Sequence, residues 1–214
     1  MRNRYLTLFY YVIALQEASR IFGLGKETAF DKSCTDDFLE LLKDQEVLRT
    51  KYGAFEVCPE SSSVTATISS VIHYAASNVR EQHRLLADAD KIGKKFRIPE
   101  KRLWHIKVKA FAESEQWSNL RILGDSRAKP PIGYKPFARA VIRGKQPESE
   151  VLRYIRRITL PEERYDLFCE AALWKKALDE AFRMRDGRRI VNVKTLCNSN
   201  DIQLLAGELM AQLT

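Results

Sequence analysis

The sequence predicts an all-α fold, an α-solenoid of antiparallel helical hairpins. Helix-favouring leucine, alanine, glutamate, lysine and arginine dominate the 214 residues, whereas there are only nine glycines and seven prolines. Apolar residues recur at spacings of three and four along about ten to twelve segments, and no segment alternates apolar and polar residues as a half-buried strand does. Successive short helix pairs without a long central bundle favour a solenoid over the alternative, an irregular helical bundle.

The first half of the chain is expected to hold four helices. The first covers residues 4–22, ends at Gly23, and has an apolar stripe of Leu6, Phe9, Tyr10, Ile13 and Phe22. The second runs from about residue 27 to residue 52, and one face carries Phe30, Cys34, Phe38, Leu41, Leu42, Gln45 and Leu48. A serine among residues 61–63 should cap a third helix, and Asn78 should cap a fourth that ends at residue 95.

The second half is expected to hold shorter helices. Pro99 stands in the first turn of a helix that begins at Ile98 and continues to Phe111, and another helix covers residues 113–123. Glycines and prolines then separate helices over residues 136–143, 148–158, 161–172, 174–185, 188–196 and 200–213.

Between two of these helices, residues 129–137 read KPPIGYKPF. Three prolines and a glycine in nine residues exclude a helix there, because proline lacks an N–H and clashes with the carbonyl four residues earlier. We expect Pro130, Pro131 and Gly133 to set the angle between hairpins. Tyr134 and Phe137 should be buried where the chain turns. An ordinary proline-rich loop is the alternative.

Composition narrows the class of protein. Apolar residues make up 45% and charged residues 30% of the chain, which supports a folded core and excludes a disordered chain. We expect residues 1–214 to form a single solenoid segment, with a possible sub-boundary near residues 124–135. No apolar run reaches the roughly 18–20 residues that span a bilayer. The stretch after Arg2 and Arg4 is similar to a signal peptide, but it lacks a clear cleavage site and continues as an amphipathic helix.

The sequence offers neither a metal site nor an active site. Its cysteines are too widely spaced to form a metal-binding pair, and we interpret them as reduced, structural residues of a cytosolic protein: Cys34, Cys58, Cys169 and Cys197. The three histidines lie on different expected helices, and no catalytic or nucleotide-binding motif occurs. We therefore predict a protein that is not an enzyme and that needs no cofactor.

The net charge of +8 is unevenly distributed. Residues 1–90 carry 10 basic and 13 acidic side chains, whereas residues 91–214 carry 26 basic and 15 acidic ones. An arginine-rich stretch over residues 153–189 would suit the phosphates of nucleic acid or an acidic lipid surface. No recognised nucleic-acid motif accompanies it. We therefore favour a solvated face, on which Arg153 and Arg157 pair with Glu150 along one helix.

Three stretches occur in an order that resembles a known family. They read ALQEASRIFGLGKETAFDKSCTDDFLELLKDQEVL at residues 14–48, FRIPEKRLWHIK at residues 96–107, and AKPPIGYKPF at residues 128–137. Their ordered combination resembles the C-terminal region of vacuolar protein sorting-associated protein sixteen over most of residues 14–185. The chain departs from the family's pattern between Ser61 and Lys94, and the resemblance is weak after about Arg185.

This resemblance implies an α-solenoid that normally follows an N-terminal β-propeller, so we expect a C-terminal fragment or a shortened paralogue. It also implies a core subunit of the HOPS and CORVET tethering complexes, cytoplasmic and peripheral on late endosome, lysosome or vacuole membranes. The implied partners are a Sec/Munc-class subunit, which clasps SNARE helices, and other HOPS/CORVET subunits, rather than nucleic acid. A paralogue, VIPAR, holds a second Sec/Munc subunit, and the motifs fit either protein.

Two of the matching segments supply the predicted partner-binding residues. On the second helix, Cys34, Phe38, Leu41 and Gln45 lie at i, i+4, i+7 and i+11 and form a continuous stripe. Packing of this stripe onto a neighbouring helix is the alternative.

In the FRIPEKRLWHIK segment we predict that Arg102 and Leu103 bind the partner. The guanidinium group can bridge to carboxylates or carbonyls while its stem covers apolar area. Trp104, by contrast, should belong to the core.

Overall fold

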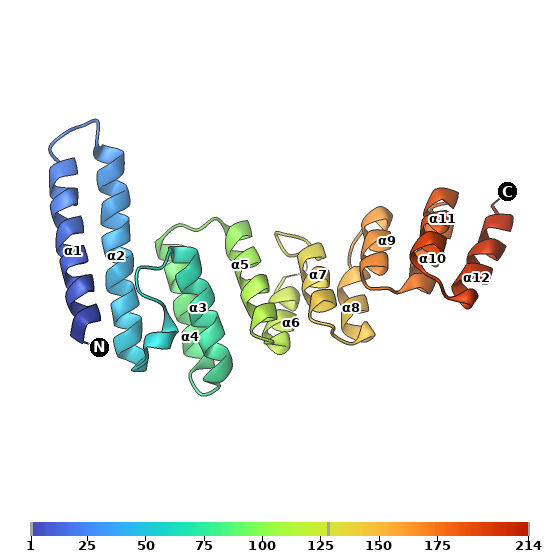
Figure 1. Cartoon of the computed structure of the whole chain (residues 1–214), viewed down its shortest axis with the longest axis horizontal. Coiled ribbons are helices and arrows are strands. Elements are labelled where there is room, and N and C mark those ends of the chain that lie inside the picture. Colours follow the sequence, from blue (N-terminus) through green and yellow to red (C-terminus); the bar gives the residue numbers. More distant parts are fainter. Residues whose placement is uncertain (1, 128, 214) are drawn as a thin grey trace. The chain divides into compact units, whose positions relative to one another are not determined.

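The computed structural model describes residues 2–127 and 129–213, with side chains from residue 9 onward. These residues form twelve α-helices and one 3₁₀ turn, with no strand among them (Figure 1). The all-α prediction is confirmed, and Ala128 of the AKPPIGYKPF stretch lies outside the described residues. The chain divides into two compact units, residues 1–99 and 100–214. The segment 124–135 lies inside the second unit, and the single solenoid segment stays a prediction.

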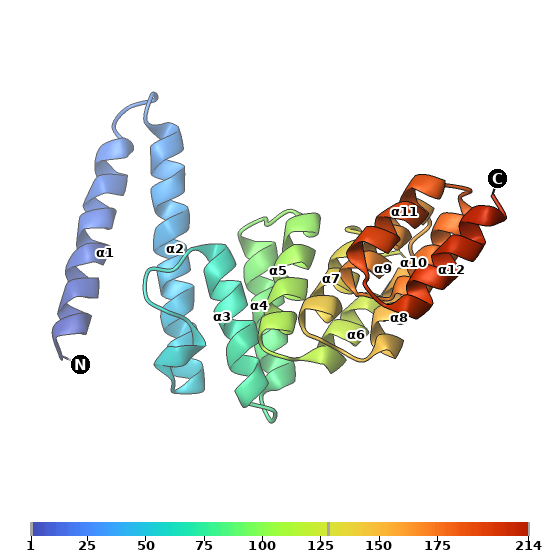
Figure 2. The same ribbon diagram turned by 45° about the vertical axis from the view of Figure 1, so that its right-hand side comes forward.

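The first unit consists of two helical hairpins. In one, α1 (Arg2–Phe22) packs against α2 (Ala29–Tyr52), side by side in both views of Figures 1 and 2. In the other, α3 (Val64–Ser77) packs against α4 (Gln82–Lys95). The 3₁₀ turn η1 (Phe55–Val57) contacts both α2 and α3 and so joins the two hairpins.

Two cap predictions have opposite outcomes. A serine does cap α3, since the Ser63 hydroxyl accepts a hydrogen bond from the Ala66 amide at 3.3 Å. The prediction that Asn78 caps α4 is wrong. Asn78 ends α3 instead, where its amide donates to the Tyr74 carbonyl at 3.0 Å. It therefore satisfies a carbonyl at a helix C-terminus rather than an amide at an N-terminus.

The apolar stripe predicted for α1 is not buried as a whole. Phe9, Tyr10 and Ile13 are exposed, and Phe22 is half-buried. Because α1 packs mainly against α2, one strip of its surface is covered, for example at Ser19, which is 8% exposed. Tyr11 meets the Phe38 ring edge-on at 6.2 Å but is still 43% exposed.

Buried polar contacts tie α2 to the second hairpin. The buried Asp88 carboxylate of α4 accepts hydrogen bonds from Lys51 and from the Tyr52 hydroxyl, both at the end of α2, and forms an ion pair with Lys91 at 3.3 Å. Burial raises the pKa of Asp88, but the hydrogen bonds from Lys51, Tyr52 and Lys91 outweigh burial and hold this pKa below its ordinary value of 3.8.

The second unit is a succession of short helices: α5 (Glu100–Glu113), α6 (Trp117–Asp125), α7 (Lys135–Arg143), α8 (Glu148–Ile155), α9 (Pro161–Glu170), α10 (Trp174–Arg183), α11 (Gly187–Leu196) and α12 (Asn200–Ala211). Contacts run between near neighbours in the sequence, from α5 with α6 and α7 to α10 with α11 and α12. This nearest-neighbour packing is what a solenoid of hairpins requires. Pro99 precedes α5 rather than standing in its first turn, and α6 begins at Trp117 rather than at Glu113.

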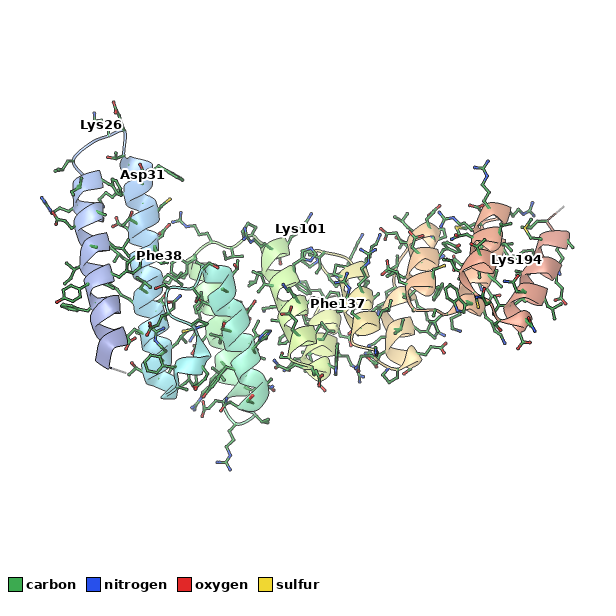
Figure 3. All side chains as sticks on the ribbon, viewed as in Figure 1. Lys26, Asp31, Phe38, Lys101, Phe137 and Lys194 are labelled. Atoms are coloured by element: carbon green, nitrogen blue, oxygen red, sulfur yellow. The ribbon has the colours of Figure 1, made fainter. Side chains whose placement is uncertain are left out.

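Phe137, at the first turn of α7, is the central ring of an aromatic cluster in the second unit (Figure 3). Its fully buried ring stacks on Tyr154 of α8 at 5.5 Å and meets the edge of Trp104 of α5 at 6.3 Å. Tyr134 lies 6.3 Å away on the proline-rich turn and is 8% exposed. Tyr134 and Phe137 are thus buried where the chain turns, as the sequence predicts.

Six helices end in the same backbone turn. The residue that follows the last helical turn has a positive φ, and the amide after it donates to the carbonyl five residues earlier, as in a Schellman motif. These residues are Gly53, Arg97, Glu115, Lys145, Ala172 and Arg185. Five of the six are not glycine, so the sequence gives no sign of these turns, and the helices expected to reach residues 172 and 185 end earlier.

Substitution of Asp88 by asparagine should destabilise the first unit in a pH-dependent way. Since the folded pKa lies below the unfolded one, the carboxylate stabilises the fold above about pH 3.8 and loses this effect as pH falls through the folded pKa. We expect the free energy of unfolding at neutral pH to fall by about 1–3 kcal/mol. The difference from wild type should shrink below pH 3.8. Urea unfolding across this pH range measures it, with Asp37→Asn, an exposed position on α2, as control. A difference that does not change with pH contradicts the prediction.

Phe137→Ala should lower the free energy of unfolding of the second unit by about 3–5 kcal/mol, because it leaves a cavity between α5, α7 and α8. Ile122→Ala is the matched control, since Ile122 is 68% exposed and its loss should cost less than about 0.5 kcal/mol. Equal urea midpoints for the two variants would show that the aromatic cluster does not hold the unit together.

Candidate protein-binding surfaces

The predicted stripe on α2 is divided between surface and interior. Cys34 is exposed and Phe38 is half-buried, whereas Leu41 and Gln45 are buried. The amide of Gln45 donates hydrogen bonds to the Ser62 carbonyl and to the Thr67 hydroxyl, both at 2.8 Å, and so fixes the start of α3 against α2. Leu41 and Gln45 therefore pack within the first unit, and the accessible part of the stripe is Cys34 with the edge of Phe38.

Two exposed apolar side chains near Cys34 were not predicted as partner-binding residues. Phe30, one turn before Cys34 on α2, is 76% exposed, and Leu24, in the turn between α1 and α2, is 78% exposed. The periodicity alone places Phe30 on the inward face. Phe30 lies next to the turn between α1 and α2, where α2 extends beyond the second hairpin. This position indicates that no neighbouring helix covers its side chain. Exposed apolar side chains gathered at one end of a hairpin are typical of a protein contact.

In the second unit, Arg102 is exposed and forms no hydrogen bond or ion pair with another described residue. Leu103 beside it is half-buried, and Trp104 is buried, as predicted for a core residue. The Arg127 guanidinium stands 5.9 Å from the Trp104 ring and pairs with Glu100 at 2.7 Å, so a neighbouring cation is engaged within the unit while Arg102 is not. Partner binding by Arg102, Leu103 and the α2 stripe stays a prediction.

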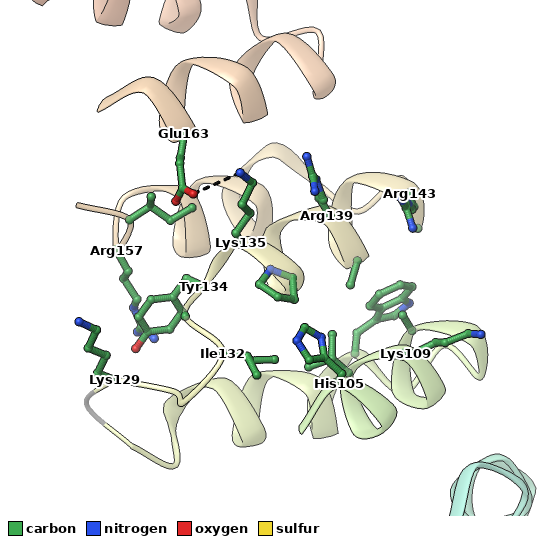
Figure 4. A pocket seen from close by; sticks show the side chains of 18 of the residues that line it. His105, Lys109, Lys129, Ile132, Tyr134, Lys135, Arg139, Arg143, Arg157 and Glu163 are labelled. Atoms are coloured by element: carbon green, nitrogen blue, oxygen red, sulfur yellow. Dashed lines mark hydrogen bonds and ion pairs between the residues drawn. The ribbon is translucent and has the colours of Figure 1, made fainter. Parts of the chain in front are cut away.

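A groove of about 1040 Å³ lies along α5 and α7 in the second unit (Figure 4). Lys135, Arg139 and Arg143, spaced four residues apart on α7, line one side. His105 and Lys109, four residues apart on α5, line the other. Val108, Trp117, Ile132, Pro136 and Ala140 supply an apolar floor. The sequence did not reveal this groove, because its two sides come from helices that are paired only by the fold.

The charges around the groove differ in how they are paired. Lys135 binds Glu163 at 3.2 Å, the dashed contact in Figure 4, and Arg139 binds Glu170 at 2.7 Å. Arg143 and Lys129 form no hydrogen bond or ion pair with other described residues. Two cations of the groove are therefore available to a ligand.

Four of the eight arginines in the stretch 153–189 form ion pairs with carboxylates of other helices: Arg153, Arg157, Arg164 and Arg189. Arg153 on α8 and Arg157 just after the end of α8 both form ion pairs with Asp125 at the end of α6, each at 2.6 Å. The prediction that they pair with Glu150 along their own helix is wrong, since Glu150 binds Arg121 instead. Burial raises the pKa of Asp125, but the hydrogen bonds from Arg157 and Arg153 outweigh it and lower this pKa overall.

The described residues hold no group of three or more histidines, cysteines, aspartates or glutamates placed to bind a metal ion. Among their helices, none is both long enough and apolar enough to cross a membrane. The four cysteines are free, as predicted. Cys58 and Cys197 are buried, Cys169 is half-buried, and Cys34 is exposed.

Gly144→Ala should disturb the groove floor. A Cβ at Gly144 would stand 2.2 Å from Cη2 and 2.6 Å from Cζ2 of the rigid Trp117 indole, so the ring must move. We expect a loss of about 1–3 kcal/mol in the free energy of unfolding and a changed tryptophan emission spectrum. Gly207→Ala on α12 is the control, since a Cβ there meets open space and should stabilise the helix by about 0.5–1 kcal/mol. Unchanged stability and emission for Gly144→Ala would refute this packing.

Comparisons with known proteins identify several relatives of this chain. The chain is 27% identical over 179 residues to the protein VACUOLELESS1 of Arabidopsis thaliana, which covers 83% of this chain and 19% of that protein. It is 28% identical over 165 residues to a vacuolar protein sorting-associated protein 16 homolog of Drosophila melanogaster, with coverage of 77% and 18%. It is 25% identical over 179 residues to a probable homolog of Schizosaccharomyces pombe, with coverage of 82% and 20%.

The chain thus spans at most about a fifth of the length of these relatives. The family model described as "Vps16, C-terminal region" matches residues 5–212, which include all the surfaces described above. The chain therefore belongs to the Vps16 C-terminal region family.

Proposed function

We propose that this chain is a non-enzymatic scaffold in membrane tethering and fusion, a segment that binds and positions a Sec/Munc-class subunit within a HOPS- or CORVET-type complex. The observation that carries the proposal is the match of residues 5–212 to the Vps16 C-terminal region. Through such a complex the chain would be peripheral on the cytoplasmic side of late endosome, lysosome or vacuole membranes. Other HOPS/CORVET subunits would be its further partners.

The geometry of the hairpins supports a binding role. Helices stacked on their sequence neighbours present continuous outer faces, and a stable protein interface needs about 1,600 Å² of buried surface. Each unit offers a surface of its own: exposed Phe30 and Cys34 in the first, and Arg102 beside Leu103 in the second.

Arg102 is the residue that we expect to contribute most. An exposed arginine without a partner among the described residues can give its full set of donors to carboxylates or carbonyls of another protein, and arginine is enriched among interface hot spots. Leu103 next to it supplies apolar area.

The alternative, a basic module that binds nucleic acid or acidic lipid through residues 153–189, has less support. Arg153, Arg157, Arg164 and Arg189 all hold carboxylates of the second unit. Phosphate binding at these positions would have to displace those carboxylates.

Arg102→Glu should weaken the complex with the Sec/Munc subunit of the same organism by about 2 kcal/mol or more, roughly thirtyfold in Kd, while leaving the fold intact. Co-purification followed by calorimetric titration measures the loss, and circular dichroism checks the helices. The matched control is Arg183→Glu, which reverses an exposed arginine of α10 that forms no hydrogen bond or ion pair with another described residue.

A wrong assignment of Arg102 and a wrong scaffold role would give different results. A folded Arg102→Glu variant that binds undiminished removes Arg102 from the interface, while the scaffold role stands. A folded wild-type chain that forms no complex with either Sec/Munc subunit refutes the scaffold role itself. A complex whose affinity collapses with salt, as phosphate-driven binding does, would favour the basic stretch instead.

A further inference from the structure

We propose that the groove along α5 and α7 is a second docking site, whose ligand is an acidic peptide segment with an apolar anchor residue. This site goes beyond the proposed function, because it uses none of the six residues predicted to bind the Sec/Munc subunit. It also needs no contact between the two units, since all its lining residues belong to the second.

The cations along the α7 side of the groove are regularly spaced. Lys135, Arg139 and Arg143 follow one another at four-residue intervals, so their side chains leave the same face of α7 (Figure 4). At a rise of about 1.5 Å per residue they form a basic edge roughly 12 Å long. Lys109 stands across the groove on α5. Because Lys109 pairs with Glu113 at 3.7 Å, the net positive charge lies along the α7 edge. Two turns of helix or a few extended residues match the length of this edge.

The groove also has an apolar floor that can hold an apolar anchor residue. Ile132 and Pro136 come from the proline-rich turn and the start of α7, and the half-buried Trp117 indole lies against Gly144 at the end of α7. The Trp117 ring occupies the space that a Cβ at Gly144 would need, since such a Cβ would stand 2.2 Å from Cη2, so the ring packs closely against the end of α7. The floor is therefore preformed, and a volume of about 1040 Å³ accommodates an apolar side chain together with the peptide backbone.

The cations of the groove are complementary in charge to the carboxylates of an acidic peptide. Lys135 and Arg139 already hold Glu163 and Glu170, which shows that carboxylates are the groups that this edge accepts. Arg143 and Lys129 have no such partner among the described residues. Carboxylates of a peptide can supply what these two cations lack, while its apolar residue covers the floor.

Nucleic acid and membranes fit this site less well. Their phosphates form a broad surface, whereas the cations here border a concave groove with an apolar floor.

The test uses a fluorescein-labelled peptide of 14 residues as probe, with glutamates spaced by four and leucine and tryptophan on the opposite face. Fluorescence anisotropy should show binding to the wild-type chain at low ionic strength. The Lys129→Glu/Arg143→Glu double variant should bind about tenfold more weakly or worse, which corresponds to about 1.4 kcal/mol. Neither cation contributes an ion pair to the described fold, so the variant should remain folded.

Matched controls separate this site from other effects. Arg183→Glu and Arg102→Glu should leave probe binding unchanged, which also distinguishes a failure here from a failure of the proposed Sec/Munc interface. A probe with serine in place of leucine and tryptophan should bind more weakly, and a probe with lysine in place of glutamate should not bind.

Four results would overturn the proposal: no binding of the acidic probe to the folded wild type, equal binding by the double variant, equal binding of the lysine probe, or undiminished binding of the serine probe. Phosphatidylserine vesicles and duplex DNA are the comparison ligands. Should either bind through Lys129 and Arg143 more tightly than the peptide does, the ligand class would be wrong.

Discussion

The packing around Phe137 is the constraint on which the second unit depends. One ring joins α5, α7 and α8 through Trp104 and Tyr154, and it leaves little room beside it. A Cβ at Gly124 of α6 would lie 3.0 Å from Tyr154 and 3.4 Å from Phe137, so the α6 backbone can approach the cluster only because that position is glycine. Burial raises the pKa of Tyr154 to about 12, which keeps its hydroxyl uncharged within the core. The walls of the groove are the outer sides of helices that this cluster fixes.

The net charge of this chain does not show which of its cations are free of ion pairs and can bind a ligand. The excess of basic residues after residue 90 suggests one broad cationic surface. The fold instead brings at least ten of these 26 residues against carboxylates distant in sequence, such as Arg139 with Glu170 and Arg157 with Asp125, which are 31 and 32 positions apart. For the cations that form no ion pair with another described residue, the surroundings decide what they can bind. Arg102 lies beside an apolar residue on an open helix face, whereas Arg143 lies at the edge of a groove.

Periodicity was enough to predict the helices, because a helix that buries one face repeats its apolar residues every three to four positions. The proline-rich turn was enough to predict that Tyr134 and Phe137 are buried, and Trp104 was also correctly predicted to lie in the core. It was not enough to divide the α2 stripe, since Cys34 and Gln45 share one face of the helix but differ in what lies opposite them. The groove could not be predicted either, because its two sides are neighbours only after α5 and α7 pack.

The repeated turn at six helix ends has a consequence for how such a chain can diverge. Its hydrogen bonds join backbone amides to backbone carbonyls, so the geometry that leads from one helix into the next does not depend on a particular side chain. A non-glycine residue with positive φ costs about 1–2 kcal/mol, a modest penalty in a packed domain. Hairpin pitch can then persist while the amino acids change, and identities of 25–28% with the relatives need not disturb it. Changes in the number of residues between helices are different, since one inserted residue would move the donor away from its carbonyl and rotate every later hairpin.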